Sequence, residues 1–354
     1  MDIIKVLAEA VKQNVSDVLI CPGFPVAFKC AGSLIPQSGG LLLPSDTEAI
    51  IRKLYELASN RRADHFLETG DDDFSFSLNS VGRFRASVFR QRGTVSAVIR
   101  VVCFELPDPG KLNIPPAVID LYTIKKGLVL ITGPAGSGKS TTLSCIVDKI
   151  NRNLPYHVIT IEDPIEYLYR NDKSIVSQRE VNHDTADFGI ALRFALRQSP
   201  NVILVGEMRD FETISIAMTA AETGQYVLST LHTVGAANTI DRIIDVFPAA
   251  RQQQVRVQLS MVLQAVVSQQ LIPTLDGGAI PAFEIMGVNS AIRNLIREGK
   301  VHQISNVIHA NPDCSMVTMD ASIYQLYLAG RISKENAVIY SMDPDAMKKK
   351  LSGK

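Results

Sequence analysis

The chain has 354 residues, of which 46% are hydrophobic, and its 36 basic and 36 acidic side chains give a formal net charge of zero. This length suggests about two domains, and the balanced charge argues against a protein whose whole surface is built to bind nucleic acid. The 5 cysteines are scattered without a C-x-x-C pair, which argues against a four-cysteine zinc site and is typical of a reduced cytosolic protein.

The first residues lack the basic region and apolar core of a signal peptide. No apolar run approaches the roughly 20 residues that a membrane-spanning helix needs. We therefore expect a cytoplasmic protein without direct membrane insertion. Any association with a membrane would be made through a partner protein.

Residues 1–105 have the pattern of a mixed α/β domain. Apolar residues at helical spacing predict a helix over residues 3–11. Alternation of apolar and polar residues predicts strands over residues 74–78, 83–88 and 95–102. These strands follow one another closely, so we expect an antiparallel meander.

A proline-rich connector over residues 106–122 is predicted to be a linker, because Pro and Gly break both helices and strands. In residues 123–354, strand candidates then alternate with helical patterns, which predicts a parallel sheet covered by helices on both faces. The candidate strands are residues 128–132, 157–161, 202–206 and 226–231. The pattern is largely helical from about residue 249, and we expect a C-terminal helical region from about residue 270.

Residues 133–140 read G-P-A-G-S-G-K-S directly after the first of these strands and match the phosphate-loop pattern G-x-x-x-x-G-K-[ST]. Backbone N–H groups of such a loop, together with the N-terminus of the following helix, bind a polyphosphate. We expect Lys139 to reach the β- and γ-phosphates of ATP and Ser140 to ligate Mg²⁺. A purely structural glycine turn is the alternative. The predicted nucleotide-binding residues are Gly133, Pro134, Ala135, Gly136, Ser137, Gly138, Lys139, Ser140 and Thr141.

Polar residues also follow three later strands, at the edge of a parallel sheet where ligands bind. Glu162 is the candidate that orients and deprotonates the attacking water, although a solvated turn is the alternative because Asp163-Pro164 follows it. The carboxylate of Glu207 would hold a Mg²⁺-bound water. His232 would sense the γ-phosphate or couple neighbouring subunits, and a hydrogen-bonded structural histidine is its alternative.

Three segments together resemble the secretion-type hexameric ATPases. Residues 159–166, 202–210 and 219–233 are similar to the Asp box, the Walker B segment and the His box of that superfamily. Residues 291–298 read A-I-R-N-L-I-R-E, a motif of the type IV pilus retraction ATPases within it. The resemblance extends from about residue 16 to about residue 333, which is nearly the whole chain.

The resemblance implies an α/β protein with a PAS-like α+β N-terminal domain, followed by a RecA-like P-loop ATPase domain with C-terminal helices. It implies a homo-hexamer that hydrolyses ATP and drives pilus retraction and twitching motility through an inner-membrane platform protein, with no nucleic acid as partner. ATP would lie between the two domains, with Arg85 and Arg100 contacting its phosphates. Alternation in residues 83–88 places Arg85 on the polar face of its strand, and solvated strand arginines are the alternative.

Residues 291–298, which we call the retraction motif, also have a helical pattern of their own. At about 100° per residue, one side is apolar and would pack on the ATPase domain, and the other is polar and would face a neighbour or a pilus component. An ordinary amphipathic helix has the same pattern. The apolar set is Ala291, Ile292, Leu295 and Ile296, and the polar set is Arg293, Asn294, Arg297 and Glu298.

The sequence departs from the family pattern at three places that bear on subunit coupling or regulation. Gln225 stands where the family commonly has histidine, and Leu19 replaces the histidine of an S-D-L-H-L pattern. Residues 197–201 read R-Q-S-P-N, where the family often has R-E-D-P-D. The predicted nucleotide-contacting residues are all present.

Three other classes of protein are alternatives for a chain with this nucleotide-binding pattern. Pilus-assembly and type II secretion ATPases usually carry a longer N-terminal region and a four-cysteine zinc module, which we do not find. A nucleic-acid translocase would favour a basic, aromatic-rich stretch, which is also missing. A non-catalytic nucleotide switch would have lost a base or a metal ligand, whereas Lys139, Ser140, Glu162 and Glu207 are all in place.

Overall fold

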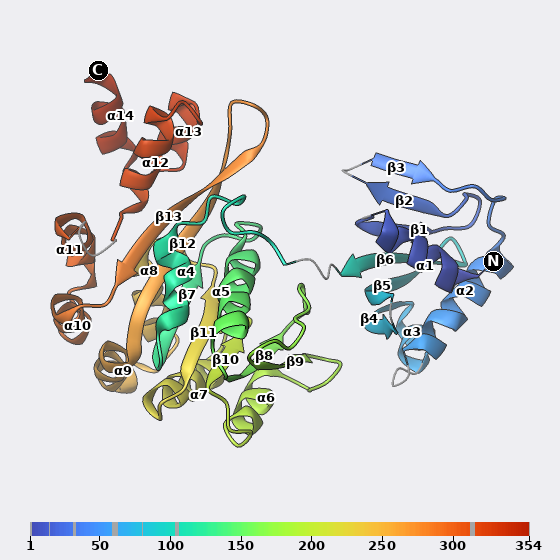
Figure 1. Cartoon of the computed structure of the whole chain (residues 1–354), viewed down its shortest axis with the longest axis horizontal. Coiled ribbons are helices and arrows are strands. Elements are labelled where there is room, and N and C mark those ends of the chain that lie inside the picture. Colours follow the sequence, from blue (N-terminus) through green and yellow to red (C-terminus); the bar gives the residue numbers. More distant parts are fainter. Residues whose placement is uncertain are drawn as a thin grey trace. The chain divides into compact units, whose positions relative to one another are not determined.

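The structure is a computed structural model, and it describes residues 2–13, 15–30, 33–58, 63–79, 81–102, 106–311 and 316–353 (Figure 1). The chain divides into two compact units. The first comprises Met1–Glu105 and Ile165–Leu168, and the second comprises Leu106–Pro164 and Tyr169–Lys354. A helix long and apolar enough to cross a bilayer does not occur within the described ranges.

The first unit is built on one antiparallel sheet of six strands in the order β3-β2-β1-β6-β5-β4. Its strands are β1 (Asp17–Ile20), β2 (Ala27–Cys30), β3 (Ser33–Pro36), β4 (Asp71–Leu78), β5 (Gly82–Gln91) and β6 (Thr94–Val102). Its helices are α1 (Ile3–Lys12), α2 (Pro44–Leu57) and α3 (Asp64–Thr69). The expected first helix and the β4–β5–β6 meander are confirmed. The sequence patterns did not indicate β1–β3, α2 or α3.

The alternation along β5 decides which of its side chains enter the first core. Phe84 and Ala86 are fully buried, whereas Arg85 between them lies on the other face and is half-buried. Helix α1 begins after Asp2, whose carboxylate accepts a hydrogen bond from the backbone N–H of Ile4 at 3.1 Å. The apolar face of α1 buries Leu7 in the same core.

The second unit is built on a seven-stranded sheet in the order β13-β12-β7-β11-β10-β8-β9. Its strands are β7 (Gly127–Thr132), β8 (His157–Glu162), β9 (Ile175–Glu180), β10 (Val202–Val205), β11 (Tyr226–Leu231), β12 (Leu263–Pro273) and β13 (Ala279–Gly287). All neighbours from β12 to β9 pair in parallel, and β13 pairs antiparallel with β12. The four predicted strands correspond to β7, β8, β10 and β11.

Helices cover both faces of this sheet, as Figure 1 shows for the elements from α4 to α9. Leu128 and Leu130 of β7 enter one apolar core with α6 to α11, and Val129 and Ile131 enter another with α4 and α5. Because successive strand residues face opposite sides, each face has its own helical layer. The helices are α4 (Pro116–Ile119), η1 (Asp120–Thr123), α5 (Lys139–Asn153), α6 (Phe188–Ala195), α7 (Phe211–Glu222), α8 (Ala236–Asp245) and α9 (Ala249–Val262).

The helical prediction for residues 263–287 is wrong, because this segment forms the strands β12 and β13. Strand β12 is buried on both faces over most of its length and pairs with β7. Its apolar residues therefore do not alternate, and their spacing imitates that of a helix. The C-terminal helices are α10 (Ser290–Arg297), η2 (Val301–Gln303), α11 (Ile304–Ala310), α12 (Met319–Leu328), α13 (Lys334–Ile339) and α14 (Pro344–Ser352).

The proline-rich connector, which we predicted to be a linker, belongs to the second unit from Leu106 onward. Ile114, Val118 and Ile119 are buried in the core that α5 shares with the sheet. Helix α4 begins at Pro116, where the fixed backbone angle of proline suits the first turn. The second half of the connector therefore packs into the core of the second unit.

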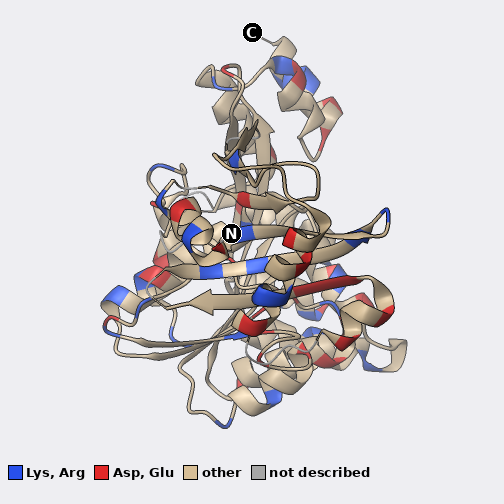
Figure 2. Ribbon diagram, turned by 90° about the vertical axis from the view of Figure 1, so that its right-hand side faces the viewer, with Lys and Arg blue, Asp and Glu red and all other residues tan. Residues whose placement is uncertain are grey.

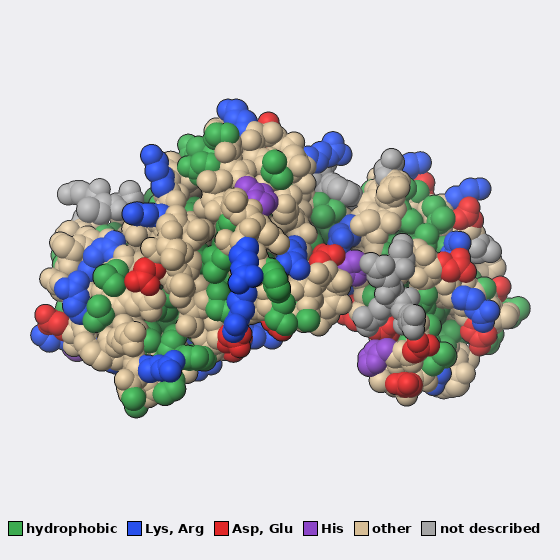
Figure 3. All heavy atoms as spheres, turned by 90° about the horizontal axis from the view of Figure 1, so that it is seen from below, with side chains coloured by type: hydrophobic (Ala, Val, Ile, Leu, Met, Phe, Trp, Pro, Cys, Tyr) green, Lys and Arg blue, Asp and Glu red, His purple; other side chains and the backbone are tan. Residues whose placement is uncertain are grey.

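Charged residues of both signs are interspersed over the molecule. Figure 2 shows basic and acidic residues mixed along the elements that it draws, and the face in Figure 3 carries small groups of each sign. This distribution agrees with the zero formal net charge. The faces drawn thus lack the single-sign surface that is typical of nucleic-acid binders.

Candidate nucleotide-binding site

The phosphate-loop segment connects the end of β7 to the beginning of α5. Gly133, Gly136 and Gly138 adopt positive φ angles of 142°, 75° and 88°. A Cβ atom at Gly133 would lie only 2.0 Å from the backbone oxygen of Gln269, so no larger residue fits there. Gly138 is the N-cap of α5 and has no side chain to cap the helix. The first backbone N–H groups of α5 therefore suit an anionic ligand.

Lys139 is only 8% exposed and is held by its own loop. Its ammonium group donates hydrogen bonds to the backbone oxygens of Gly133 and Pro134, both at 2.9 Å. Ser137 is buried as well, and its hydroxyl has no hydrogen-bond partner within the described part of the chain. A buried hydroxyl without a partner is costly unless a ligand satisfies it, which fits a phosphate oxygen in this loop.

Glu207 and His232 lie beside Lys139, because β10 and β11 end next to each other and β11 also pairs with β7. The Nε2 atom of His232 is 3.0 Å from Oε1 of Glu207, and its Nδ1 atom is 3.4 Å from Nζ of Lys139. The structure therefore brings these three predicted residues into one chain of contacts, with the histidine in the middle.

The second carboxylate oxygen of Glu207 binds Arg209, with Oε2 at 2.6 Å from a guanidinium nitrogen. Burial would raise the pKa of Glu207, but the hydrogen bond from Arg209 and the positive charges of His232 and Arg209 lower it overall below its ordinary value. Glu207 is therefore ionised at neutral pH, as a residue that holds a metal-bound water must be.

A hollow of about 360 Å³ lies on the side of this group formed by β10, β11 and α8. Arg209 and Arg242 contribute two positive charges to its wall, against the single negative charge of Glu207. Its lining residues are Glu207, Met208, Arg209, Leu231, His232, Thr233, Arg242 and Val246. This charge balance suits an anionic group.

Glu162 ends β8, the strand on the other side of β10. Its Oε1 atom accepts hydrogen bonds from the Thr160 hydroxyl at 2.6 Å and from the Gln178 amide at 3.3 Å. The carboxylate is thus held in place at the same sheet edge as Glu207 and His232. This position suits a group that orients a water molecule.

Arg85 and Arg100 belong to the first unit and lie directly opposite each other on β5 and β6. The Nε atom of Arg85 donates to Asp73 at 2.9 Å, and Nε of Arg100 donates to Asp17 at 3.2 Å. The structure therefore brings the two predicted arginines together on one face of the first sheet, each with an aspartate.

The retraction motif forms α10, but two of its residues differ from the sequence prediction. Ile292 and Ile296 are fully buried, whereas Ala291, which we expected on the buried side, is exposed. Arg293, which we expected on the free polar side, is half-buried and donates to the backbone oxygens of Ser260 and Met261 at 2.6 and 3.0 Å. These carbonyl groups belong to the last turn of α9, so Arg293 caps that helix. The exposed polar side consists of Asn294, Arg297 and Glu298.

Gln225 precedes β11, whereas His232 follows it. The two positions therefore lie at opposite edges of the sheet within one subunit. The Gln225 side chain accepts a hydrogen bond from Thr223 at 2.8 Å, and its backbone oxygen accepts one from the N–H of Gly127 at 3.0 Å. Gln225 therefore stabilises the beginning of β11, which is the end of that strand far from the phosphate loop.

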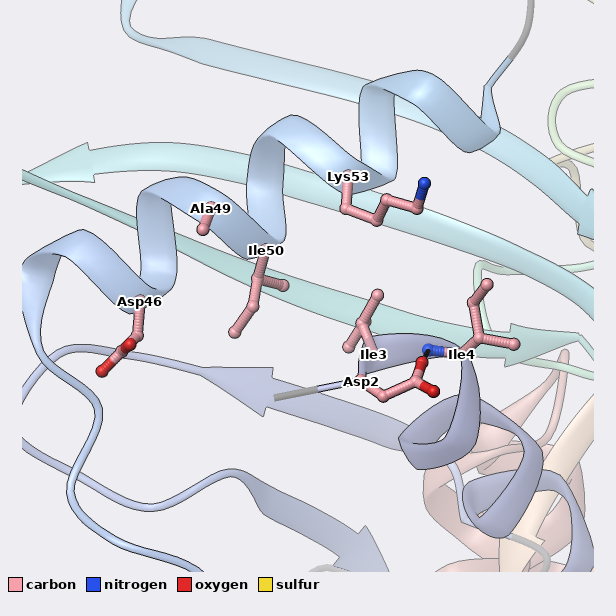
Figure 4. A pocket seen from close by; sticks show the side chains of 7 residues that line it. All are labelled: Asp2, Ile3, Ile4, Asp46, Ala49, Ile50 and Lys53. Carbon is pink, nitrogen blue, oxygen red and sulfur yellow. Dashed lines mark hydrogen bonds between the residues drawn. The ribbon is translucent and has the colours of Figure 1, made fainter.

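A second hollow, of about 290 Å³, lies in the first unit at the N-termini of α1 and α2 (Figure 4). Its polar groups are engaged by their own helices. Asp2 caps α1, and Asp46 accepts a hydrogen bond from the backbone N–H of Leu43 at 2.8 Å. Lys53 pairs with Glu56 at 2.7 Å. The geometry gives no reason to place a ligand here.

Known proteins resemble this chain in sequence and in fold. Residues 48–319 match the family model described as "Type II/IV secretion system protein". The chain therefore belongs to the type II/IV secretion system protein family. Its expected two-domain α/β fold is confirmed by a crystal structure described as the pilus retraction motor PilT with bound ADP. That structure is 44% identical, has a TM-score of 0.90 and covers 99% of each chain.

Two curated relatives are similar over most of the chain. The type IV pilus retraction ATPase PilT of Pseudomonas aeruginosa is 43% identical over 337 residues, which is 95% of this chain and 97% of that protein. A twitching motility protein of Neisseria gonorrhoeae is 46% identical over 276 residues, which is 78% of this chain and 74% of that protein. The resemblance to the retraction ATPases is thus confirmed.

Proposed function

We propose that this protein is an ATP-hydrolysing hexameric motor that drives type IV pilus retraction. The contact chain from Lys139 through His232 to Glu207 carries the proposal, because it joins the phosphate loop to the acidic end of a neighbouring strand. Similarity to a pilus retraction ATPase over 95% of the chain supports the cellular role.

In the proposed site, the backbone N–H groups of the loop and the ammonium group of Lys139 bind the phosphates of ATP. Mg²⁺, which neutralises phosphate charge, would be held by the hydroxyl of Ser140 and, through water, by the carboxylate of Glu207. The ionised state of Glu207 supports this role.

Glu162 orients the attacking water and accepts its proton as the bond to the γ-phosphate breaks. His232 senses the γ-phosphate, and its contacts with both Lys139 and Glu207 support this role. Arg85 and Arg100 stabilise the negative charge that develops on the transferred group, an effect worth about 10³- to 10⁵-fold in rate for arginines in such positions.

We further propose that the motor acts at the inner face of the cytoplasmic membrane through a platform protein. The exposed polar side of α10, with Asn294, Arg297 and Glu298, is a candidate surface for a neighbour or a pilus component. ATP-dependent changes around a ring of six subunits would be passed to the pilus base through such contacts.

Deletion of the gene in the source cell tests the proposal. We expect surface pili that are present but do not retract, with retraction restored by the wild-type gene and not by Lys139→Ala. Complementation with Lys149→Ala, a lysine on the outer part of α5, is the matched control and should restore retraction. A cell without surface pili would instead identify a pilus-assembly motor.

A further inference from the structure

Gln269 of β12 lies buried against the phosphate loop, with only 3% of its surface exposed. Its amide nitrogen donates a hydrogen bond to the backbone oxygen of Ser137 at 2.6 Å. Its amide oxygen accepts one from the hydroxyl of Thr142 at 2.7 Å. One side chain therefore joins the last part of the loop to the first turn of α5.

Gln269 also lies close to two glycines of the phosphate loop. A Cβ atom at Gly133 would lie 2.0 Å from the Gln269 backbone oxygen, and one at Gly138 would lie 2.9 Å from its amide nitrogen. The clash at Gly133 is with backbone and could not be relieved, so the loop passes over β12 there only because this residue has no side chain, whereas a Cβ at Gly138 would displace the Gln269 amide. Gln269 therefore packs closely against the phosphate loop at both glycines.

The hydrogen bond to Ser137 fixes the orientation of the peptide between Ser137 and Gly138. This peptide is trans, so its C=O and N–H groups point in opposite directions. Because the oxygen of Ser137 points at the Gln269 amide, the N–H group of Gly138 points away from β12. That group lies at the N-terminus of α5, where phosphate oxygens bind.

The residue before Gln269 on the same strand holds a second segment. The hydroxyl of Ser268 accepts a hydrogen bond from the N–H of Gly235 at 2.8 Å, and Glu284, its cross-strand partner, accepts one from the N–H of Ala236 at 2.7 Å. Strand β12 therefore supports the phosphate loop and also the segment that follows His232.

We propose that Gln269 is a positioning residue for nucleotide binding. Its side-chain amide holds the Ser137–Gly138 peptide so that the Gly138 N–H group faces the phosphates. This inference rests on the proposed nucleotide site, and it adds a residue that lies outside the phosphate-loop sequence. Loss of the amide should weaken nucleotide binding, with a smaller effect on the chemical step.

Gln269→Glu provides the sharpest test, because it keeps the shape of the side chain and removes the donor to Ser137. Binding of a fluorescent ADP analogue with Mg²⁺ should be about tenfold weaker at neutral pH, which corresponds to the loss of one buried hydrogen bond. At mildly acidic pH the introduced carboxyl group becomes protonated and can donate again, so the difference from wild type should shrink. Burial favours this by raising the pKa of such a group.

Gln269→Met removes both hydrogen bonds and should weaken binding at every pH. In ATP hydrolysis its KM should rise more than its kcat falls. Gln270→Met is the matched control. The next residue along the strand points its amide at the backbone oxygen of Tyr340, at 3.2 Å, and its variant should bind ADP as wild type does.

Wild-type affinity in Gln269→Glu and Gln269→Met would overturn the proposal. So would a loss in Gln269→Glu that is independent of pH and follows only a fall in thermal stability. If Gln269→Glu does not fold, Thr142→Val takes its place, since it removes the hydroxyl that holds the amide oxygen. It should weaken ADP binding several-fold, and wild-type affinity there would contradict the inference. Failure of the wild-type protein to bind ADP would instead remove the proposed nucleotide site.

Discussion

Arg85 and Arg100 lie directly opposite each other on the antiparallel strands β5 and β6, and each binds a different aspartate. Opposed like charges are unfavourable in a sheet. Asp73 and Asp17 offset this repulsion, while the pairing of the two strands places both guanidinium groups on one face. In the proposed mechanism these two groups would stabilise the charge that develops on the transferred phosphate.

Under the proposed mechanism, Arg85→Ala and Arg100→Ala should each lower the kcat of ATP hydrolysis by about 10³-fold, because each would remove a positive charge from the transition state. Thermal stability should change little, since exposed ion pairs contribute only about 0–1 kcal/mol. Steady-state hydrolysis and thermal unfolding measure the two effects separately. Asp73→Asn is the control, because it keeps the guanidinium group and should retain most of the activity. Wild-type turnover in both arginine variants would remove these residues from the site.

Lys139→Ala and Glu207→Ala should abolish ATP hydrolysis. In the proposed site, the first removes the charge that would bind the β- and γ-phosphates, and the second removes the carboxylate that would hold the metal-bound water. Phosphate release from ATP with Mg²⁺ is the measurement. Lys149→Ala, on the same helix as Lys139, should hydrolyse ATP at the wild-type rate. Robust hydrolysis by both Lys139→Ala and Glu207→Ala would contradict the site assignment.

The residues that meet at the sheet edge could be predicted because they follow strands with clear apolar runs. In a parallel sheet, residues that follow neighbouring strands meet at one edge, whatever their distance in sequence. Glu207 and His232 were found in this way, and the structure brings them together with Lys139. The same rule could not find Gln269, because β12 is buried on both faces and its pattern resembles that of a helix.

Arg293 shows a second limit of sequence patterns. Helical periodicity places it beside Ile296, about 60° away around the helix, at the border of the buried side, but periodicity does not reveal what lies beside a helix. The last turn of α9 lies there, and its unpaired carbonyl groups attract the guanidinium group. Long-range partners of this kind require the tertiary structure.

Glu162→Gln should separate nucleotide binding from hydrolysis. The amide oxygen can still accept the hydrogen bond from Thr160, so the local structure should be retained. It cannot accept a proton from water, and kcat should fall by about 10²- to 10⁴-fold. ADP affinity should stay close to that of wild type. Glu166→Gln, which removes a negative charge from the same stretch of sequence, is the control, and equal activity in both variants would show that Glu162 is not the base.

Cys145 should react slowly with alkylating reagents in the folded protein. Burial raises the pKa of its thiol to about 11, and the charge of Asp148 adds to the effect. The thiol therefore stays protonated at neutral pH, and its alkylation rate should increase steadily as the pH rises toward that value. Mass spectrometry of alkylated peptides can compare it with the half-buried Cys21 and Cys30. Rapid labelling of Cys145 at neutral pH, before the protein unfolds, would contradict this environment.

Arg293 and Arg297 of α10 should have separable roles. Arg293→Ala removes the cap on α9 and should destabilise the protein by about 1 kcal/mol, because carbonyl groups lose their donor. Arg297→Ala changes an exposed side chain on the same helix, so stability should change little. If the exposed side of α10 contacts a pilus component, Arg297→Ala should impair retraction in cells while ATP hydrolysis by the purified protein is retained. Thermal unfolding, hydrolysis and retraction measured on both variants test this separation. Normal retraction in Arg297→Ala and in Glu298→Ala would show that α10 serves the fold and not a partner.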